Sequence, residues 1–297
     1  MGFDTISEKR VMVQGLSTSY LEAGTGPVLV LIHGNLTAAQ GWDRTIEEFR
    51  TTHKVLAPSL PGYGGTSPLR DVTLDGLVSF IAAFLDATSV DTAIVLGHSA
   101  GGLIAAQFAL ENPDRVSRLV LVDSVGLGRA INPVVIAGAL LPGWATEIAI
   151  AALLLPGGGI LRALMRGVQV RRPWRLTVQE WRTQTRIMQA QTLLSTSFQA
   201  VRLVVGPAGQ RGRYNLVERL GELPMPTLLI WGLTDEVVPF WQGIRAARKI
   251  PRARFVPLVS AGHAGYLECH VDFVTALSPF IRDEPDTSGP QRTPTQR

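Results

Sequence analysis

Apolar runs of strand length recur along the chain and alternate with amphipathic segments of helical length. Residues 27–32 read PVLVLI, and such a continuous apolar run is typical of a strand that is buried on both faces. The same pattern predicts further strands at residues 54–58, 92–96, 118–122, 227–231 and 254–259, after an edge hairpin at residues 10–15 and 18–23. Helices are predicted at residues 74–87, 102–112, 240–250 and 266–282. The alternation indicates an α/β fold with a mostly parallel sheet and helices on both faces.

The alternation stops in the middle of the chain. The stretch between the strands predicted at residues 118–122 and 227–231 lacks strand-like runs and contains several helix candidates, including residues 178–194 and 197–205. We therefore expect an inserted all-helical cap between two sheet strands. The polar C-terminal tail contains proline and glycine and is expected to be disordered. The chain thus divides into a first part of the core at residues 1–126, the cap at residues 127–220, a second part of the core at residues 221–282 and the tail at residues 283–297.

One apolar stretch within the expected cap is about long enough to span a membrane. Residues 134–155 read VVIAGALLPGWATEIAIAALLL, but Pro142 and Gly143 interrupt the run and Glu147 lies in its second half. Because proline and glycine disfavour a continuous helix, two short helices joined by a turn are the expected structure. We expect no stable membrane insertion, while partial contact with a membrane surface stays open.

Charge and cysteine content limit the function classes and the compartment. The 297 residues carry a net charge of +4, with 25 arginines but only 3 lysines. This excess of arginine, whose codons are GC-rich, indicates a GC-rich bacterial genome. No nucleic-acid reader motif accompanies the positive charge, so nucleic acid is not an expected partner. With one cysteine, Cys269, and no apolar leader in MGFDTISEKR, the expected location is the cytoplasm.

Arginines are concentrated in one part of the expected cap. Seven of them, and the single acid Glu180, fall between residues 162 and 186. Such a segment is either a solvated helical face or a region that attracts acidic substrates or anionic lipid surfaces. Metal and nucleotide motifs do not occur in the sequence: there is no H-E-x-x-H, Cys/His cluster, P-loop or G-x-G-x-x-G. We expect no metal and no cofactor, and the sequence leaves the oligomeric state open.

A candidate nucleophile lies in the segment GHSAG at residues 97–101, which follows an apolar strand and precedes a predicted helix. It has the G-x-S-x-G pattern of a nucleophile elbow, in which small flanking residues allow a tight turn from strand to helix. This turn projects the serine hydroxyl above the sheet, near the positive end of the following helix. Ser99 is therefore the predicted nucleophile.

A serine hydroxyl needs a base that takes its proton. Among the five histidines, His263 lies in GHAG just past the last predicted strand, at the sheet edge that carries the elbow. His98 is adjacent to Ser99 and is expected to point elsewhere, and His270 falls within the final predicted helix. His263 is the predicted base.

The base in turn needs a carboxylate that orients it. Asp235 follows an apolar strand and a turn that contains Gly232, whereas Asp123 follows a different strand. Both carboxylates fall between the serine and the histidine in the chain and at the same edge of the expected sheet. Asp235 is the favoured acid, and Asp123 stays the alternative.

With these segments the chain resembles the α/β-hydrolase superfamily, in its capped bacterial branch of esterases, epoxide hydrolases, dehalogenases and carbon–carbon bond hydrolases. The resemblance covers about residues 10–282. LIHGN at residues 31–35 is similar to the family's oxyanion-hole loop. The resemblance implies that the backbone N–H groups of Asn35 and Ala100 face the substrate carbonyl. At Ser59, in SLPGYGGTS, the family usually has an aspartate in a structural position.

The nucleophile separates the chemistries within this family, because epoxide hydrolases and haloalkane dehalogenases use aspartate at the elbow. A serine with an oxyanion hole suits attack on a carbonyl carbon and formation of an acyl-enzyme. We expect a serine esterase whose small-molecule substrate is bulky and mostly apolar. The alternatives are hydrolysis of a carbon–carbon bond beside a ketone, a cofactor-free biosynthetic reaction with a repurposed triad, and a binding-only role. The expected substrate contacts are His33, Gly34, Leu36, His98, Trp144 and Val237.

Overall fold

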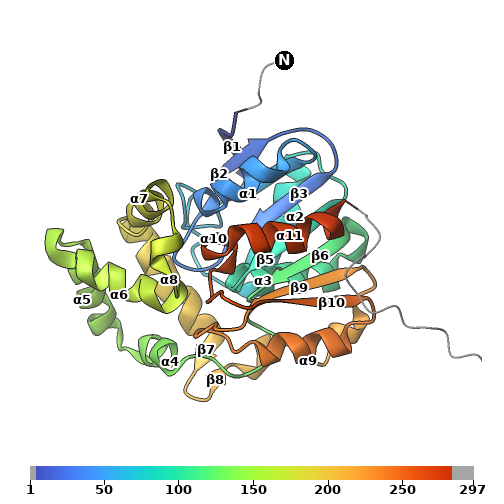
Figure 1. The fold of residues 1–297 in the computed structure, drawn as a ribbon. Coiled ribbons are helices and arrows are strands. Elements are labelled where there is room, and N and C mark those ends of the chain that lie inside the picture. The colour runs from blue at the N-terminus through green and yellow to red at the C-terminus, as the bar shows by residue number, and fades with distance from the viewer. Residues whose placement is uncertain (1–4, 283–297) are drawn as a thin grey trace, which may run out of the picture.

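The computed structural model describes residues 5–282, so the predicted disordered tail lies outside the described residues. The main sheet is formed by β1 Ser7–Val13, β2 Leu16–Ala23, β3 Val28–Ile32, β4 Lys54–Pro58, β5 Ala93–His98, β6 Val116–Val122, β9 Thr227–Gly232 and β10 Ala253–Leu258. These strands lie in the order β1-β2-β4-β3-β5-β6-β9-β10 (Figure 1). All neighbouring pairs from β4 to β10 are parallel, and β1 and β2 run antiparallel at one edge. The predicted mostly parallel sheet is confirmed.

Helices cover both faces of this sheet. One face is covered by α2 Leu74–Ala87, α3 Ala100–Glu111 and α9 Trp241–Lys249. The other face is covered by α1 Asp43–Phe49, α10 Gly265–Glu268 and α11 His270–Ile281, as Figure 1 shows for α1 and α11. Short 3₁₀ turns lie at Ala39–Trp42, Pro113–Arg115, Pro156–Gly158, Pro173–Arg175, Gly212–Tyr214 and Leu220–Glu222.

Strand β3 explains why the central strands are apolar throughout. Its side chains alternate between the two faces of the sheet: Val30 and Ile32 belong to one core cluster, and Leu29 and Leu31 belong to the other. All four side chains are 0% exposed. Because helices cover both faces, a polar side chain at any of these four positions could not reach water.

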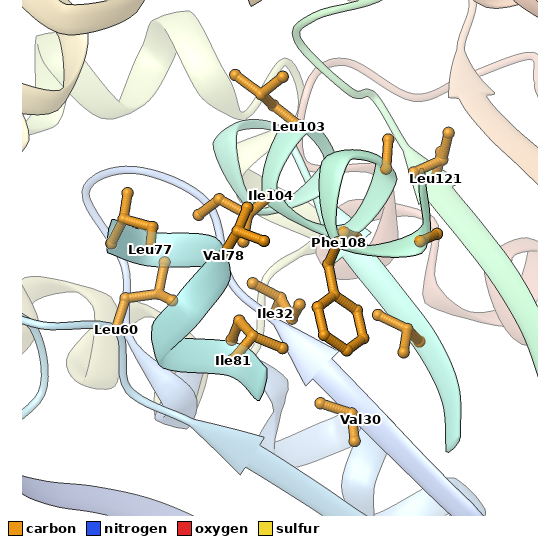
Figure 2. Close-up of a cluster of buried hydrophobic side chains, with 14 of the residues drawn as sticks. Val30, Ile32, Leu60, Leu77, Val78, Ile81, Leu103, Ile104, Phe108 and Leu121 are labelled. Carbon is orange, nitrogen blue, oxygen red and sulfur yellow. The ribbon is translucent and has the colours of Figure 1, made fainter. Parts of the chain in front are cut away.

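Figure 2 shows one of these clusters in detail. Val78 and Ile81 of α2 and Phe108 of α3 gather around Val30 and Ile32 of β3. Aromatic and branched side chains of this size bury a large apolar area, and each fully buried one contributes about 1.5–3 kcal/mol of transfer free energy. This core fixes the strands whose C-terminal ends carry the candidate site.

The strand order reverses next to β3. From β3 the chain goes first to β4 on one side of that strand, and then to β5 on its other side. In open α/β sheets, ligands bind outside the carboxyl ends of the strands at such a switch point. The predicted elbow follows β5 and the predicted oxyanion loop follows β3, so both lie at this position.

Between β6 and β9 the chain forms a helical insertion, residues 133–204. It consists of α4 Pro133–Leu140, α5 Gly143–Leu154, α6 Gly159–Gln169, α7 Val178–Ile187 and α8 Gln191–Val204. In Figure 1 these helices lie to one side of the sheet, beyond the ends of the central strands. A small hairpin of β7 Val205–Gly206 and β8 Gly209–Gln210 follows.

The sequence predicts an all-helical cap at residues 127–220, and the β7–β8 hairpin corrects this prediction. Pro207 has no backbone N–H and cannot continue the helix α8. Gly209 has φ +95°, a conformation that glycine adopts readily and that allows the chain to reverse. Local turn chemistry thus ends the helical insertion before its expected boundary.

Three other helix predictions need correction at their ends. The helix predicted at 178–194 ends at Ile187, and α8 spans the gap that we had expected between residues 194 and 197. The final helix, predicted at 266–282, breaks at Cys269, whose φ of −126° and ψ of 45° are not helical. Apolar periodicity continues across the breaks after Ile187 and at Cys269, so the pattern alone does not locate them. In addition, helix α1 was not predicted.

The long apolar stretch forms α4 and α5, which meet at an angle of 113°, as expected for two short helices. Within residues 5–282 no single helix is long and apolar enough to cross a membrane. The bent α4–α5 pair reaches that length and composition only when its two helices are counted together.

The arginine-rich segment is not a single solvated face. Arg162 and Arg166 are 7% and 5% exposed, whereas Leu164 between them is 65% exposed. The Arg162 guanidinium donates to the carbonyl of Leu153, and the Arg166 guanidinium lies 4.5 Å from the centre of the Trp181 ring. Helix α6 thus turns two arginines inward and an apolar side chain outward.

Candidate active site

Ser99 occupies the turn between β5 and α3, at the C-terminal edge of the sheet. Its backbone has φ 54° and ψ −118°, and such a conformation costs a non-glycine residue about 1–3 kcal/mol. The N–H of Ser99 donates to the carbonyl of Val122 at 3.0 Å, which ties the turn to the end of β6. The strained turn leaves the hydroxyl facing the space above the sheet.

Two glycines of the elbow are required by close packing. A Cβ atom at Gly97 would lie 2.2 Å from the carbonyl oxygen of Gly101. A Cβ atom at Gly101 would lie 2.4 Å from the carbonyl oxygen of Ile32. Both distances are far below van der Waals contact, so any larger residue would force β3, β5 and α3 apart. This packing is the physical reason for the G-x-S-x-G spacing.

His263 connects Ser99 to Asp235. Its Nε2 lies 2.8 Å from Oγ of Ser99, and its Nδ1 lies 2.9 Å from Oδ2 of Asp235. The other oxygen of Asp235 accepts the N–H groups of Val237 at 2.7 Å and of Val238 at 3.0 Å. The carboxylate is therefore fixed, and it favours the tautomer with a proton on Nδ1. Nε2 is then free to accept the proton of Ser99.

Asp123 lies at the end of the neighbouring strand β6. Its Oδ1 accepts the N–H of Gly232 at 2.8 Å, and its Oδ2 has no hydrogen-bond partner among the described residues. Burial, together with the nearby Asp235 carboxylate, raises the pKa of Asp123 well above 3.8. Among the described residues, the carboxylate that lies within hydrogen-bond distance of His263 Nδ1 is that of Asp235, so the geometry favours Asp235 as the orienting acid.

Asn35 and Ala100 flank Ser99 in the wall of a cavity. Ala100 is the first residue of α3, where backbone N–H groups have no intrahelical acceptor. The Asn35 side chain is held on both sides: Oδ1 accepts the Tyr63 hydroxyl at 2.6 Å, and Nδ2 donates to the Ser197 carbonyl at 3.2 Å. These contacts fix the loop after β3 beside the nucleophile. Asn35 and Ala100 thus share one cavity wall with Ser99.

The cavity has a volume of about 210 Å³ and lies between the sheet edge and the helical insertion. Among residues 5–282, no Asp, Glu, Lys or Arg side chain forms part of its wall. Its polar wall residues are Asn35, Ser99, Gln169 and His263, and its apolar ones include Leu36, Val134, Met165, Val168, Phe198, Val201 and Val237. Leu36 and Val237, two expected substrate contacts, are thus in the wall. Within residues 5–282, no group of three or more His, Cys, Asp or Glu side chains could hold a metal ion.

Three other expected substrate contacts, His33, Gly34 and His98, are buried and are not among the described residues of the cavity wall. His33 is 1% exposed, and its Nε2 accepts the N–H of Leu60 at 2.9 Å. The Nε2 of His98 donates to the carbonyl of His263 at 2.7 Å. Gly34 packs against His98, because a Cβ atom there would lie 2.8 Å from the His98 Nδ1. These contacts fix the three residues in the framework around the site.

Trp144, the last expected contact, is 68% exposed and is not part of the cavity wall. The insertion contributes Gln169 and Phe198 instead, which the sequence did not single out. Helical periodicity indicates which residues share a face, but it does not indicate which face meets the cavity. The hydrophobic pattern of the sequence therefore did not indicate that Gln169 and Phe198 line the cavity.

Comparison with known proteins places this geometry in a family. Residues 27–268 match the sequence profile of the alpha/beta hydrolase fold. The chain belongs to the α/β-hydrolase fold family. This membership confirms the resemblance noted from LIHGN and GHSAG.

Three relatives of this α/β-hydrolase illustrate the range of the family. A 2-hydroxy-6-oxo-6-phenylhexa-2,4-dienoate hydrolase of Burkholderia cepacia is 27% identical over 93% of this chain and 94% of its own. A dihydrolipoyllysine-residue acetyltransferase component of the acetoin cleaving system of Cupriavidus necator is 29% identical over 91% of this chain and 67% of its own. The crystal structure of a meta-cleavage product hydrolase variant superposes with a TM-score of 0.75 at 26% identity, covering 93% of this chain and 98% of that one.

Proposed function

We propose that this α/β-hydrolase is a serine hydrolase that cleaves neutral, mostly apolar carboxylic esters through an acyl-enzyme. The observation that carries the proposal is the hydrogen-bonded series of Ser99, His263 and Asp235. Its Ser99 and His263 lie in the wall of a cavity to which the described residues contribute no Asp, Glu, Lys or Arg side chain. A hydroxyl at 2.8 Å from an imidazole nitrogen is within reach of proton transfer. The apolar wall beside it supports the binding of an acyl group.

The first half of the reaction forms the acyl-enzyme. Nε2 of His263 takes the proton of Ser99 while Oγ attacks the carbonyl carbon of the ester. The carbonyl oxygen becomes an anion, which the backbone N–H groups of Asn35 and Ala100 would stabilise. The bond to the alcohol oxygen then breaks, and this oxygen receives the proton from His263.

The second half releases the acid. His263 takes a proton from a water molecule, whose oxygen attacks the carbonyl carbon of the acyl-enzyme. The bond between this carbon and Oγ of Ser99 breaks, and Oγ regains the proton. Throughout, Asp235 holds the ring in one tautomer and stabilises its charged form.

The helical insertion would act as a cap over these steps. Side chains of α4, α6 and α8 form most of the cavity wall opposite Ser99. A cap that excludes water strengthens the hydrogen bonds to the oxyanion, because the local dielectric constant falls. The same apolar wall favours a substrate whose acyl group buries apolar surface.

The uncharged wall disfavours anionic substrates. A carboxylate that enters such a cavity loses its hydration without gaining a cation, which costs several kcal/mol. The dienoate named for the Burkholderia relative is a carboxylate, whereas the described part of this chain places no Arg or Lys side chain in the cavity wall. Because the cavity wall offers no cation to a carboxylate, it supports a neutral ester as the substrate.

Hydrolysis of a carbon–carbon bond beside a ketone is the second candidate. It is favoured by the 27% identity to that dienoate hydrolase over 94% of the relative's length. The attacked group is again a carbonyl, so Ser99 and His263 would serve the same roles. The leaving group is then a carbon atom that must receive a proton.

Turnover of matched substrates separates these candidates. We expect kcat/KM for a neutral straight-chain acyl ester to exceed that for an ester of equal length ending in a carboxylate by about 100-fold. Ser99→Ala corrects for background hydrolysis. Faster turnover of 2-hydroxy-6-oxo-6-phenylhexa-2,4-dienoate than of every neutral ester would instead support carbon–carbon bond hydrolysis.

A further inference from the structure

Glu268 is a buried carboxylate that the proposed reaction steps do not use. It ends α10 and is 3% exposed. Its Oε1 accepts the N–H of Gly262 at 2.6 Å, and its Oε2 accepts the N–H of Arg172 at 2.7 Å. Gly262 directly precedes His263, whereas Arg172 belongs to the helical insertion. One carboxylate thus joins the loop that carries His263, here called the His263 loop, to the helical insertion.

Two further contacts connect the same parts of the molecule. The N–H of Ala264, which directly follows His263, donates to the carbonyl of Gln169 at 2.9 Å. Arg171 forms an ion pair with Glu236, in the loop that carries the acid. The His263 loop is therefore tied to the insertion on both sides of the ring, once directly and once through Glu268.

Gly262 allows the insertion to approach the His263 loop closely. A Cβ atom at this position would lie 2.9 Å from Cβ of Arg171 and 2.9 Å from Oε1 of Glu268. Both contacts are shorter than van der Waals packing permits. A side chain at position 262 would therefore push the insertion and the loop apart while leaving the Glu268 carboxylate in the protein.

We infer that Glu268 is a positioning residue, whose carboxylate holds the His263 loop in register with the helical insertion so that Nε2 reaches Ser99. This inference rests on the proposed function, because it assigns Glu268 a task in the same site. A carboxylate accepts hydrogen bonds only, so its two oxygens satisfy both N–H donors at once. An amide of the same shape has one oxygen, and its NH₂ group would face the second donor.

The test compares Glu268→Gln and Gly262→Ala with Asp272→Asn, which changes an exposed acid of α11. We measure the rate at which a neutral fluorophosphonate labels Ser99, kcat and KM for the best ester, and the melting temperature. The downfield proton resonance of the His263–Asp235 hydrogen bond reports the ring position directly. A displacement of about 1 Å in an active site can cost up to about 100-fold in rate.

We expect Glu268→Gln and Gly262→Ala to lower the labelling rate and kcat by about 10- to 100-fold, with KM changed by less than about twofold. The downfield resonance should shift or broaden in both variants, and Asp272→Asn should match the wild type. Folded variants that label at the wild-type rate would overturn the inference. So would a loss of labelling with an unaltered resonance, because the effect would then not pass through His263.

The inference can still be tested if the Glu268→Gln variant does not fold or if the wild-type protein is not labelled. If Glu268→Gln does not fold, Gly262→Ala alone decides, because it separates the same surfaces sterically. If the wild type itself is not labelled at Ser99, the proposed function fails. The resonance still tests the coupling in that case: a shift in the folded variants supports the positioning role, and an unchanged resonance contradicts it.

Discussion

The sheet edge and the helical insertion contribute to the cavity in opposite ways. The sheet edge supplies Ser99, His263 and Asp235, and the side chains of His263 and Asp235 are 3% and 0% exposed. Each of them is held by hydrogen bonds at 2.7–3.0 Å. The insertion supplies an apolar wall, in which Gln169 is the polar side chain among its described residues. Under the proposed function, the sheet edge would carry the chemistry and the insertion would select the substrate.

The largest effect is expected at the sheet edge. Asp235→Asn should lower kcat by about 10⁴-fold, because the histidine loses the carboxylate that sets its tautomer. Asp123→Asn is the matched control from the neighbouring strand, and it should cost less than about tenfold, since asparagine still offers an oxygen to the Gly232 N–H. Steady-state kinetics of the purified, folded variants measure both. The reverse ranking would make Asp123 the orienting acid.

A smaller effect, on selectivity, is expected in the insertion. Phe198→Ala removes an aromatic ring from the cavity wall and should lower kcat/KM for a long-chain ester by about tenfold. The acetyl ester should be nearly unaffected, because a short acyl group does not reach the ring. Trp144→Ala removes an exposed aromatic ring of the same insertion and serves as the control. Equal losses in both variants, or equal losses on both esters, would argue against the assigned wall.

The wall also predicts a graded response to acyl length. Each methylene that enters the cavity should raise kcat/KM up to about fourfold, which corresponds to about 0.8 kcal/mol of buried apolar surface. The rise should stop when the cavity of about 210 Å³ is full. A series of esters with increasing acyl chains measures this response. A strong preference for acetyl esters would contradict the role given to the insertion.

The smallest effect concerns stability at the sheet edge. Burial raises the pKa of Asp123 above 3.8 in the folded protein, so the folded state binds a proton that the unfolded state has released. Stability therefore falls as the pH rises from about 4 toward the raised pKa. Asp123→Asn lacks this titration. The melting temperature of the variant, relative to that of the wild type, should therefore rise as the pH increases. Parallel melting profiles from pH 4 to 9 would show that Asp123 ionises normally.

The two regions also differ in how far the sequence predicts them. Strand β4 and helix α2 begin and end at the predicted residues. The elbow at Ser99 was predicted from the G-x-S-x-G pattern, whose Gly97 is required because a Cβ atom there would clash with its neighbours. These features depend on a few neighbouring residues or on a repeated apolar pattern. The choice between Asp123 and Asp235 needed the geometry, because both follow parallel strands at one edge.

The insertion was predicted less well for a physical reason. In α6, Arg162 and Arg166 are buried and Leu164 is exposed, so the usual link between apolar and inward-facing positions is reversed. The arginines remain buried because they find a carbonyl and an aromatic ring as partners. Trp144 illustrates the consequence: its apolar character suggested a place in the wall, but its side chain lies at the surface.

Covalent labelling of Ser99 tests the central claim most directly. The wild-type protein is treated with a neutral fluorophosphonate, and the modified peptide is identified by mass spectrometry. Ser99→Ala is treated in parallel, with its fold checked by circular dichroism. We predict one phosphonyl group per chain, attached to Ser99, and no labelling of Ser99→Ala. A folded wild-type protein that stays unlabelled, or a Ser99→Ala variant that is labelled equally fast, would contradict Ser99 as the nucleophile.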